Sequence, residues 1–429
     1  MNENKNRGWR IAETILLICI IGLVFLLKLS TDAALFKKEY NKFSDRGLAR
    51  INIVLDGISL KEIDEGSKET KYEGNKLVLY KDKQIKVFNN VEIKGRGNTT
   101  WLKEKKPYQI KLSHNVDLLN TGKSKKWVLL ANSLDSTHLR NDIAMMLAEM
   151  VGMEFNHRGE FIELYVDDEY RGLYYMIQKV EINKGSVDLK GEDGVLFELD
   201  MNHKGEKDYY VTYFGEHLVL SDSVKNDLDE EDKAITSFIN DFNKAEKTIE
   251  TNDYKKLIKI LDIDSFAKYF LINEFAVNPD AYSTSFYLYR NKEDKIAAGP
   301  VWDFDLAFSN REWIWQVDDR ILSPYEDMIK KREAFGLDGL EEDLNISKIF
   351  YYLMDIPEFK EKVSLLFRNK LSGREEELIK AISDKKAFID DAAIINNERW
   401  GKDDYEEEYM RLVEWIKARY SFFEEKYGR

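Results

Sequence analysis

The stretch NPDAYSTSFYLYRNKEDKIAAGPVWDFDLAF, residues 278–308, decides how this chain is interpreted. Two short apolar runs, 286–289 and 296–301, are separated by a polar turn, which is the pattern of a β-hairpin. Asp280 precedes the first run and Asp303 follows the second. Because antiparallel strands return the chain to its starting point, the pattern predicts that these two carboxylates face one site.

Carboxylates gathered without histidine or cysteine are typical ligands of Mg²⁺ or Mn²⁺ beside a phosphate-bearing substrate. Asp280, Asp303 and Asp305 are the candidate residues of such a site. An aspartate, a short hairpin and a second aspartate also form the phosphoryl-transfer site of protein kinases. The alternative is that these residues only form turns and caps. Against it, aspartates beside Trp302 and Phe304 would lose solvation unless a cation or hydrogen-bond donors compensate.

A second candidate region is KGRGNTTWLKEKKPYQIKL, residues 94–112. Its glycines allow a tight backbone, and Lys111 lies on a predicted strand, 108–112. Positive charge comes from Arg96, Lys103, Lys105 and Lys106. Backbone amides and a strand lysine suit nucleotide phosphates. A lysine-rich strand is equally typical of a solvated sheet edge, so this alternative stays open.

Composition limits the remaining function classes. The 429 residues include 65 Lys or Arg and 79 Asp or Glu, a formal net charge of −14, which argues against a general nucleic-acid binder. The single cysteine, Cys19, cannot form an intramolecular disulfide. The five histidines show no zinc-ligand spacing.

The N-terminal segment predicts a membrane anchor. Residues 1–10 are basic and 11–29 are almost wholly apolar, close to the length that crosses a bilayer. The positive flank places residues 1–10 in the cytoplasm and everything after the anchor outside it, beginning with a polar stalk, 30–47. We therefore expect a single-pass protein of the cell membrane with an extracytoplasmic catalytic domain. A cleaved signal peptide is the alternative.

The rest of the chain predicts an α+β fold. Residues 48–184 alternate apolar and polar positions at period two around one helical stretch, 135–150, and form a β-rich lobe. Residues 185–429 are mainly helical and contain the hairpin; one of their helices is expected to begin at an Asp264 N-cap and to stop before Pro279.

Four stretches in order resemble the spore coat protein H (CotH) kinases, atypical members of the protein kinase-like fold. They are RGNTTW with KKPYQIKL (96–112), WVLLANSLDSTHLRND (127–142), FIELYVDDEYRGLYYMIQKVE (161–181), and NPDAYSTSFYLY with GPVWDFDLAF (278–308). The resemblance spans roughly residues 50 to 310. It implies a bilobal, protein kinase-like arrangement of the two lobes.

The resemblance also implies roles for single residues. Asp280 would position the acceptor hydroxyl, Asp303 would bind magnesium, and the basic segment from Arg96 would lie over the nucleotide phosphates. Lys111, with Lys106 as second choice, would contact ATP. Two positions have alternative interpretations. Ser285 stands where kinases usually have a metal-binding Asn, so metal binding would be altered or shared with Asp305; Glu149 is a candidate partner of the nucleotide lysine, although a surface role is equally open.

The leading hypothesis is therefore a membrane-anchored extracytoplasmic kinase that uses ATP and Mg²⁺ or Mn²⁺. The resemblance implies transfer to Ser or Thr of a surface or spore-coat protein. A catalytically silent kinase-like adhesin or structural protein is the alternative. A third possibility, carbohydrate binding, rests on the aromatic residues Trp313, Trp315 and Tyr325.

Overall fold

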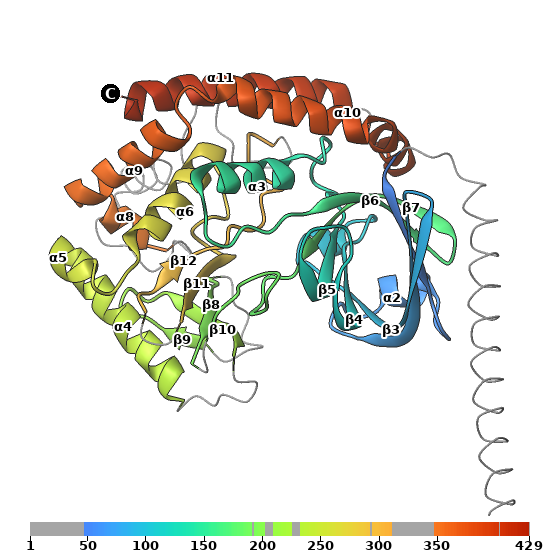
Figure 1. The fold of residues 1–429 in the computed structure, drawn as a ribbon, viewed down its shortest axis with the longest axis horizontal. Coiled ribbons are helices and arrows are strands. Elements are labelled where there is room, and N and C mark those ends of the chain that lie inside the picture. Colours follow the sequence, from blue (N-terminus) through green and yellow to red (C-terminus); the bar gives the residue numbers. More distant parts are fainter. Residues whose placement is uncertain are drawn as a thin grey trace, which may run out of the picture.

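The fold is taken from a computed structural model, which describes residues 47–190, 193–201, 209–224, 232–291, 294–310, 347–402 and 404–428. Two β-structures and a set of helices make up this part of the chain (Figure 1). The predicted membrane segment 11–29, the stalk, and Trp313, Trp315 and Tyr325 lie outside the described residues. Within the described ranges, no helix combines the length and hydropathy that a membrane crossing requires.

The first β-structure is a closed barrel with the strand order β1-β2-β3-β4-β5-β7-β6. Its strands are β1 (Ala49–Val54), β2 (Tyr72–Lys81), β3 (Gln84–Gly95), β4 (Tyr108–Asp117), β5 (Lys123–Leu130), β6 (Glu160–Val166) and β7 (Glu169–Gln178). Neighbouring strands are antiparallel except β1 and β6, which pair in parallel with Ile51 opposite Leu164. This pairing closes the barrel and leaves it without an open edge.

The barrel interior is filled by side chains that alternate along the strands. Tyr108, Ile110 and Leu112 of β4 point inward and are buried, while Gln109 and Lys111 between them are partly exposed. Trp127 of β5 is also fully buried in this core. The period-two pattern of the sequence is therefore the pattern of a barrel with a packed apolar core.

A second, five-stranded sheet has the order β12-β11-β8-β10-β9. Its strands are β8 (Val195–Leu199), β9 (Tyr209–Val211), β10 (His217–Ser223), β11 (Phe286–Arg290) and β12 (Ala297–Ala298). The predicted hairpin lies at one edge of this sheet, because β11 pairs with β12 through Leu288 opposite Ala298 and pairs with β8 on its other side.

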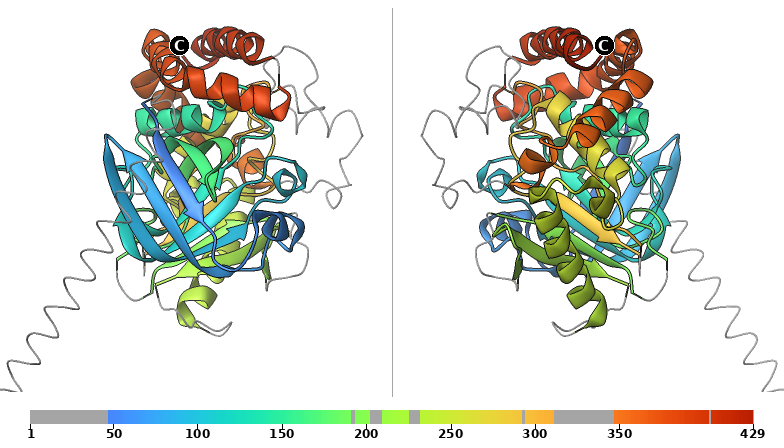
Figure 2. Two further views of the ribbon diagram at one scale, coloured as in Figure 1. Left: turned by 90° about the vertical axis from the view of Figure 1, so that its right-hand side faces the viewer. Right: turned by 90° about the vertical axis from the view of Figure 1, so that its left-hand side faces the viewer.

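The short helix α2 (Leu60–Glu65) and the short 3-10 helix η1 (Thr100–Leu102) lie in the barrel region, and the other helices pack around the sheet and beside the barrel (Figure 1). These other helices are α3 (Arg140–Val151), α4 (Lys233–Glu250), α5 (Tyr254–Leu257), α6 (Ile263–Ala276), α8 (Ile349–Leu353), α9 (Pro357–Lys370), α10 (Glu375–Trp400) and α11 (Tyr405–Tyr427). The paired helices α10 and α11 run along one side of the molecule, above α3, and α10 reaches the barrel (Figures 1 and 2).

One large apolar core holds the sheet and the helices together. It contains Phe238 of α4, Phe270 of α6, Phe350 of α8 and Phe423 of α11, together with Leu147 of α3. Helix α3 therefore packs on α6 and α9, although it falls within the β-rich segment of the sequence. Its role is to connect the barrel to the helical region.

The predicted α+β character is confirmed, because a β-rich region and a set of helices are both present. The β-rich region is a closed barrel, and the mainly helical region contains a sheet of its own, which the sequence analysis saw only as separate short strands. The predicted N-cap Asp264 is wrong. Asp262 caps α6 by accepting a hydrogen bond from the Asp264 backbone N–H, which leaves Asp264 in the first turn, where its negative charge favours the helix dipole.

Candidate active site

The loop that carries Asp280 is held by the end of helix α6. The helix stops at Val277, which adopts a left-handed conformation with φ 48°, directly before Asn278 and Pro279. The Asp280 backbone N–H donates to Asn278 Oδ1 (3.2 Å), and the Asp280 carbonyl accepts from the backbone N–H groups of Ser283 (3.0 Å) and Thr284 (3.2 Å). These bonds fix the backbone that carries the Asp280 carboxylate.

The two outer ends of the hairpin are joined by the same asparagine. Asn278 Nδ2 donates to the backbone carbonyl of Asp303 at 3.3 Å, so the Asp280 loop and the Asp303 loop lie side by side. Asp303 has φ 65°, a backbone conformation that non-glycine residues seldom adopt. The next residue, Phe304, donates its N–H to Asn141 Oδ1 of helix α3 at 2.9 Å. Helix α3 therefore helps to hold the Asp303 backbone in place.

Burial raises the pKa of all three aspartates, and neighbouring carboxylates add to the rise at Asp280 and Asp305. Burial raises the pKa of Asp280 to about 7, and the neighbouring Asp303 carboxylate adds to the rise. Burial also raises the pKa of Asp303, which Arg96 partly offsets. Burial together with the charges of Asp303, Asp280 and Asp135 holds the pKa of Asp305 well above its usual range. The hairpin thus brings Asp280, Asp303 and Asp305 into one poorly solvated region where their negative charges repel.

This arrangement is not a preformed metal site. Among the residues that the structure describes, no three His, Cys, Asp or Glu side chains stand close enough together to hold a metal ion. The aspartates interact through their charges, and a cation that entered would have to draw them closer. Ser285, the other predicted metal ligand, directly precedes β11 and is buried, with φ 56°. Its hydroxyl makes no hydrogen bond to these aspartates within the described part of the chain.

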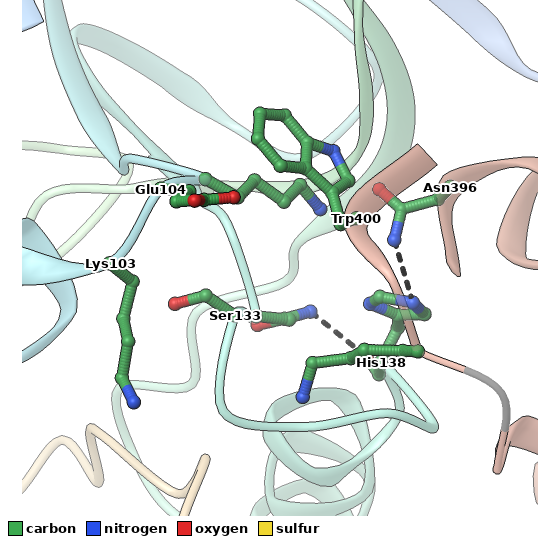
Figure 3. Close-up of a pocket in the computed structure, with 9 residues that line it drawn as sticks. Lys103, Glu104, Ser133, His138, Asn396 and Trp400 are labelled. Atoms are coloured by element: carbon green, nitrogen blue, oxygen red, sulfur yellow. Dashed lines mark hydrogen bonds between the residues drawn. The ribbon is translucent and has the colours of Figure 1, made fainter. Parts of the chain in front are cut away.

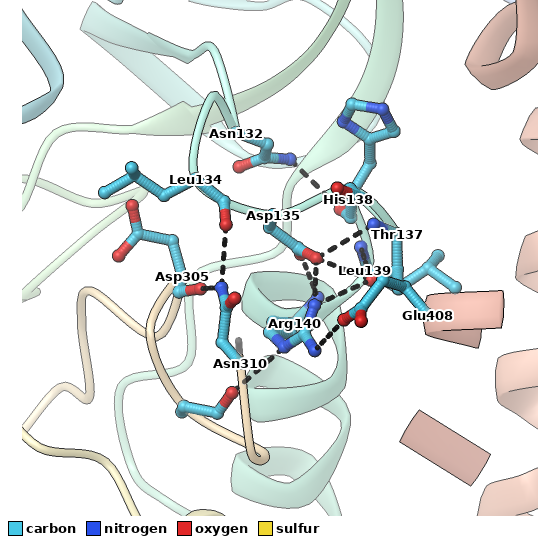
Figure 4. A network of polar contacts seen from close by, with 12 residues as sticks. Asn132, Leu134, Asp135, Thr137, His138, Leu139, Arg140, Asp305, Asn310 and Glu408 are labelled. Atoms are coloured by element: carbon cyan, nitrogen blue, oxygen red, sulfur yellow. Dashed lines mark hydrogen bonds and ion pairs between the residues drawn. The ribbon is translucent and has the colours of Figure 1, made fainter. Parts of the chain in front are cut away.

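A buried ionic network fixes the loop that follows Asp305 (Figure 4). Arg140, at the start of α3, is fully buried and forms an ion pair with the equally buried Asp135. It also donates to the Ala307 carbonyl at 3.0 Å and lies 3.4 Å from Glu408 of α11. Asn310 donates to the carbonyls of Asp305 (2.5 Å) and Leu134 (2.8 Å). These contacts tie the aspartate loop to α3 and to α11.

The predicted nucleotide-contacting residues lie in different places. Arg96 is at the site: its guanidinium lies 5.1 Å from the centre of the Trp302 ring and acts on Asp303 electrostatically. Lys106 is turned toward its own loop, where it donates to the Trp101 carbonyl at 2.6 Å. Lys111 lies on the outer face of β4, 43% exposed, and is 3.9 Å from Glu92. Only Arg96 of these three thus acts on the aspartates among the described contacts.

Glu149, the candidate partner of a nucleotide lysine, pairs instead with Arg158 at the surface. Both side chains are more than half exposed, so this ion pair is solvated and worth little.

Sequence reasoning missed the asparagines that position the site. Asn278 and Asn141 hold the backbone at Asp303 and Phe304. Asn310 holds the backbone at Asp305. All three are almost fully buried. A signal was present, since Asn278 directly precedes Pro279 and Asn141 lies in the matched stretch 127–142. Nothing in the sequence, however, shows which backbone group a buried amide will contact.

Comparison with known proteins identifies a family. A search of curated proteins gives no match. The family described as "CotH kinase protein" matches residues 92–423, which include the β3–β4 loop, α3, the hairpin with its aspartates, and helices α8 to α10. Because the match covers well over half of the chain, the chain belongs to the CotH kinase protein family.

Proposed function

We propose that this protein is a CotH-type kinase that transfers the γ-phosphate of ATP to a Ser or Thr hydroxyl of a surface or spore-coat protein. The observation that carries the proposal is the convergence of Asp280, Asp303 and Asp305 from both ends of one hairpin, beside Arg96. Three carboxylates that repel one another in a poorly solvated place are stabilised by a divalent cation. Family membership supports the reaction class.

The residues present suit Mg²⁺ or Mn²⁺. Hard divalent cations prefer carboxylate oxygens, and Asp303 and Asp305 would hold the ion, with Ser285 as the remaining candidate. The ion would neutralise charge on the phosphates during transfer. Arg96 would add a fixed positive charge to the same region, because Trp302 holds its guanidinium from one face. ATP would therefore approach a site with acidic residues on one side and a cation on the other.

Asp280 is suited to receive the proton of the acceptor hydroxyl. Burial and Asp303 raise the pKa of Asp280 to about 7, near the pH at which a base has the best balance of ionised form and proton affinity. Its backbone is fixed by Asn278 and by the turn at Ser283 and Thr284. The carboxylate can thus orient a hydroxyl and accept its proton while the phosphoryl group leaves the nucleotide.

The proposal includes a kinase-like division of the chain. The barrel would correspond to the β-rich lobe, and the sheet with its helices would form the lobe that carries the hairpin. Arg96 comes from the β3–β4 loop of the barrel region and the aspartates come from the other region. The residues 11–29 would anchor the protein in the cell membrane, with the kinase region outside the cytoplasm.

A second function is favoured by two specific observations. Ser285 stands where kinases usually have a metal-binding Asn, and the described residues contain no preformed metal cluster. Both features suit a kinase-like protein without catalysis that serves as a surface adhesin or structural protein.

A metal-dependent binding and transfer assay separates the two functions. The full chain is incubated with labelled ATP and Mg²⁺ or Mn²⁺, with Asp303→Ala and Asp280→Ala compared to the exposed control Asp391→Ala. Asp303→Ala is expected to abolish metal-dependent ATP binding. Asp280→Ala is expected to keep binding and to slow transfer roughly 100-fold or more. A wild-type protein that neither binds nor transfers would favour the non-catalytic function.

A further inference from the structure

A polar cavity of about 200 Å³ lies where three distant segments meet (Figure 3). Lys103 and Lys105 come from the loop between β3 and β4, Ser133 and His138 come from the segment between β5 and α3, and Lys402 follows α10. The volume is several times the roughly 30 Å³ that one water occupies. The cavity therefore has room for a small polyatomic group.

The cavity has a surplus of positive charge. Three lysines line it, and Glu104 is the only acidic residue among them and is largely exposed. Lys105 is almost fully buried and donates to the carbonyls of Ala131 (2.6 Å) and Leu173 (2.5 Å). Burial, together with the positive charge of Lys402, holds the pKa of Lys105 well below its usual range. Neighbouring lysines in a partly buried cavity would be stabilised by an anion.

The wall of the cavity also contains polar atoms without partners. Within the described part of the chain, His138 Nδ1 and Ser133 Oγ are buried and form no hydrogen bond. The other ring nitrogen of His138 contacts Asn397 Oδ1 at 2.8 Å, so the ring is held in place while Nδ1 is not used. No hydrogen bond or ion pair of the Lys103 ammonium is found among the described residues either. Buried polar atoms such as His138 Nδ1 and Ser133 Oγ normally meet a ligand or water, and the partly exposed Lys103 ammonium is available beside them.

We propose that this cavity binds a phosphate group. A phosphate is compact and doubly charged, and its oxygens accept hydrogen bonds in several directions, which suits Lys103 and Lys402 as ammonium donors and Ser133 as a hydroxyl donor. A hydrogen phosphate could in addition donate to His138 Nδ1. Figure 3 shows Lys103 on one side of the lining residues, His138 on the other and Ser133 between them.

The cavity is connected to the aspartate site through one short segment. Ser133 lines the cavity, and the carbonyl of the next residue, Leu134, accepts the hydrogen bond from Asn310 that also holds the Asp305 carbonyl. The phosphate group could belong to a nucleotide, to a phosphorylated side chain or to free phosphate. Only the nucleotide assignment rests on the proposed function.

Phosphate binding is tested by titrating the full chain with inorganic phosphate, followed by ³¹P NMR or calorimetry, without divalent metal. Lys103→Gln and Lys402→Gln are each expected to weaken binding roughly tenfold, because each removes a charged hydrogen-bond donor. The matched control is Lys125→Gln, an exposed lysine on β5 outside the cavity, which should bind as the wild type does. Circular dichroism melts confirm that all three variants are folded.

Two further arms identify the source and separate this inference from the proposed function. Displacement of phosphate by a non-hydrolysable ATP analogue assigns the phosphate group to a nucleotide. Displacement by a phosphoserine peptide assigns it to a protein side chain. Either result supports phosphate binding in the cavity. Asp303→Asn should keep phosphate binding while it loses metal-dependent ATP binding. The inference is overturned if the wild type does not bind phosphate, or if Lys125→Gln weakens binding as much as Lys103→Gln, even when ATP still binds with metal.

Discussion

Asp280→Asn should stabilise the metal-free protein above neutral pH. Burial and Asp303 raise the pKa of Asp280 from 3.8 to about 7, so the folded state resists ionisation. In the unfolded chain this carboxyl ionises near pH 3.8, while in the folded protein it stays protonated up to about pH 7. The free energy of unfolding therefore falls as the pH rises from 3.8 to about 7. One pKa unit corresponds to about 1.36 kcal/mol, so the full loss is about 4 kcal/mol.

The size of the effect can be worked out for two pH values. At pH 5 the wild type has lost about 1.5 kcal/mol of this contribution, and at pH 8 it has lost about 4 kcal/mol. An asparagine does not titrate. The free energy of unfolding of Asp280→Asn, relative to the wild type, should therefore rise by roughly 2 to 3 kcal/mol between pH 5 and pH 8.

Urea unfolding of the full chain in the presence of a chelator, at both pH values, measures this difference. The exposed control Asp391→Asn should change stability by less than about 0.5 kcal/mol at either pH. If the wild type and Asp280→Asn keep the same stability difference at pH 5 and pH 8, Asp280 is not held near Asp303 in a poorly solvated place. The convergence argument, and with it the proposed metal site, would then be refuted.

Three further predictions concern other buried groups. Burial raises the pKa of Glu246 from 4.5 to about 8, so the free energy of unfolding falls as the pH rises between these values. In the same unfolding assay, the free energy of unfolding of Glu246→Gln relative to the wild type should rise by roughly 3 kcal/mol between pH 5 and pH 8. Arg140→Met leaves the fully buried Asp135 without its ion-pair partner and should lower the free energy of unfolding by about 3 to 5 kcal/mol, measured at pH 7. Gly172 has a φ of 119°, and the added methyl group of Gly172→Ala would clash with Asn396 Oδ1. The melting temperature should fall by several degrees, whereas the exposed control Lys125→Ala should leave it unchanged.

The sequence predicted individual strands and helices where apolar residues recur at a clear spacing. The strands near 51–55, 161–166 and 286–289 and the helix ending before Pro279 are present. It did not show that β1 and β6 pair in parallel, because that contact joins residues more than 100 positions apart. Local patterns specify which residues are buried and not which distant strand lies beside them.

The candidate site also has a part that the sequence predicts and a part that it does not. The aspartates Asp280 and Asp303 could be paired from the sequence, because a hairpin brings its own ends together regardless of the rest of the fold. The choice between Arg96, Lys106 and Lys111 could not be made, since all three are basic residues of one segment. Their directions depend on the barrel: Lys111 lies at an outward position of β4, Lys106 returns to its own loop, and Arg96 crosses to Trp302.

The sequence by itself thus determined the acidic hairpin, because its residues are near one another in the chain, and the family, because its motifs are recognised by residue type and order without the fold. Tertiary structure alone decided which cation meets the aspartates, which asparagines hold their backbones, and that lysines from the β3–β4 loop and the end of α10 share a cavity. The physical reason is that charge, burial and hydrogen bonding at a point in space depend on every segment that reaches it. Those segments are assembled only when the barrel closes and α10 packs against it.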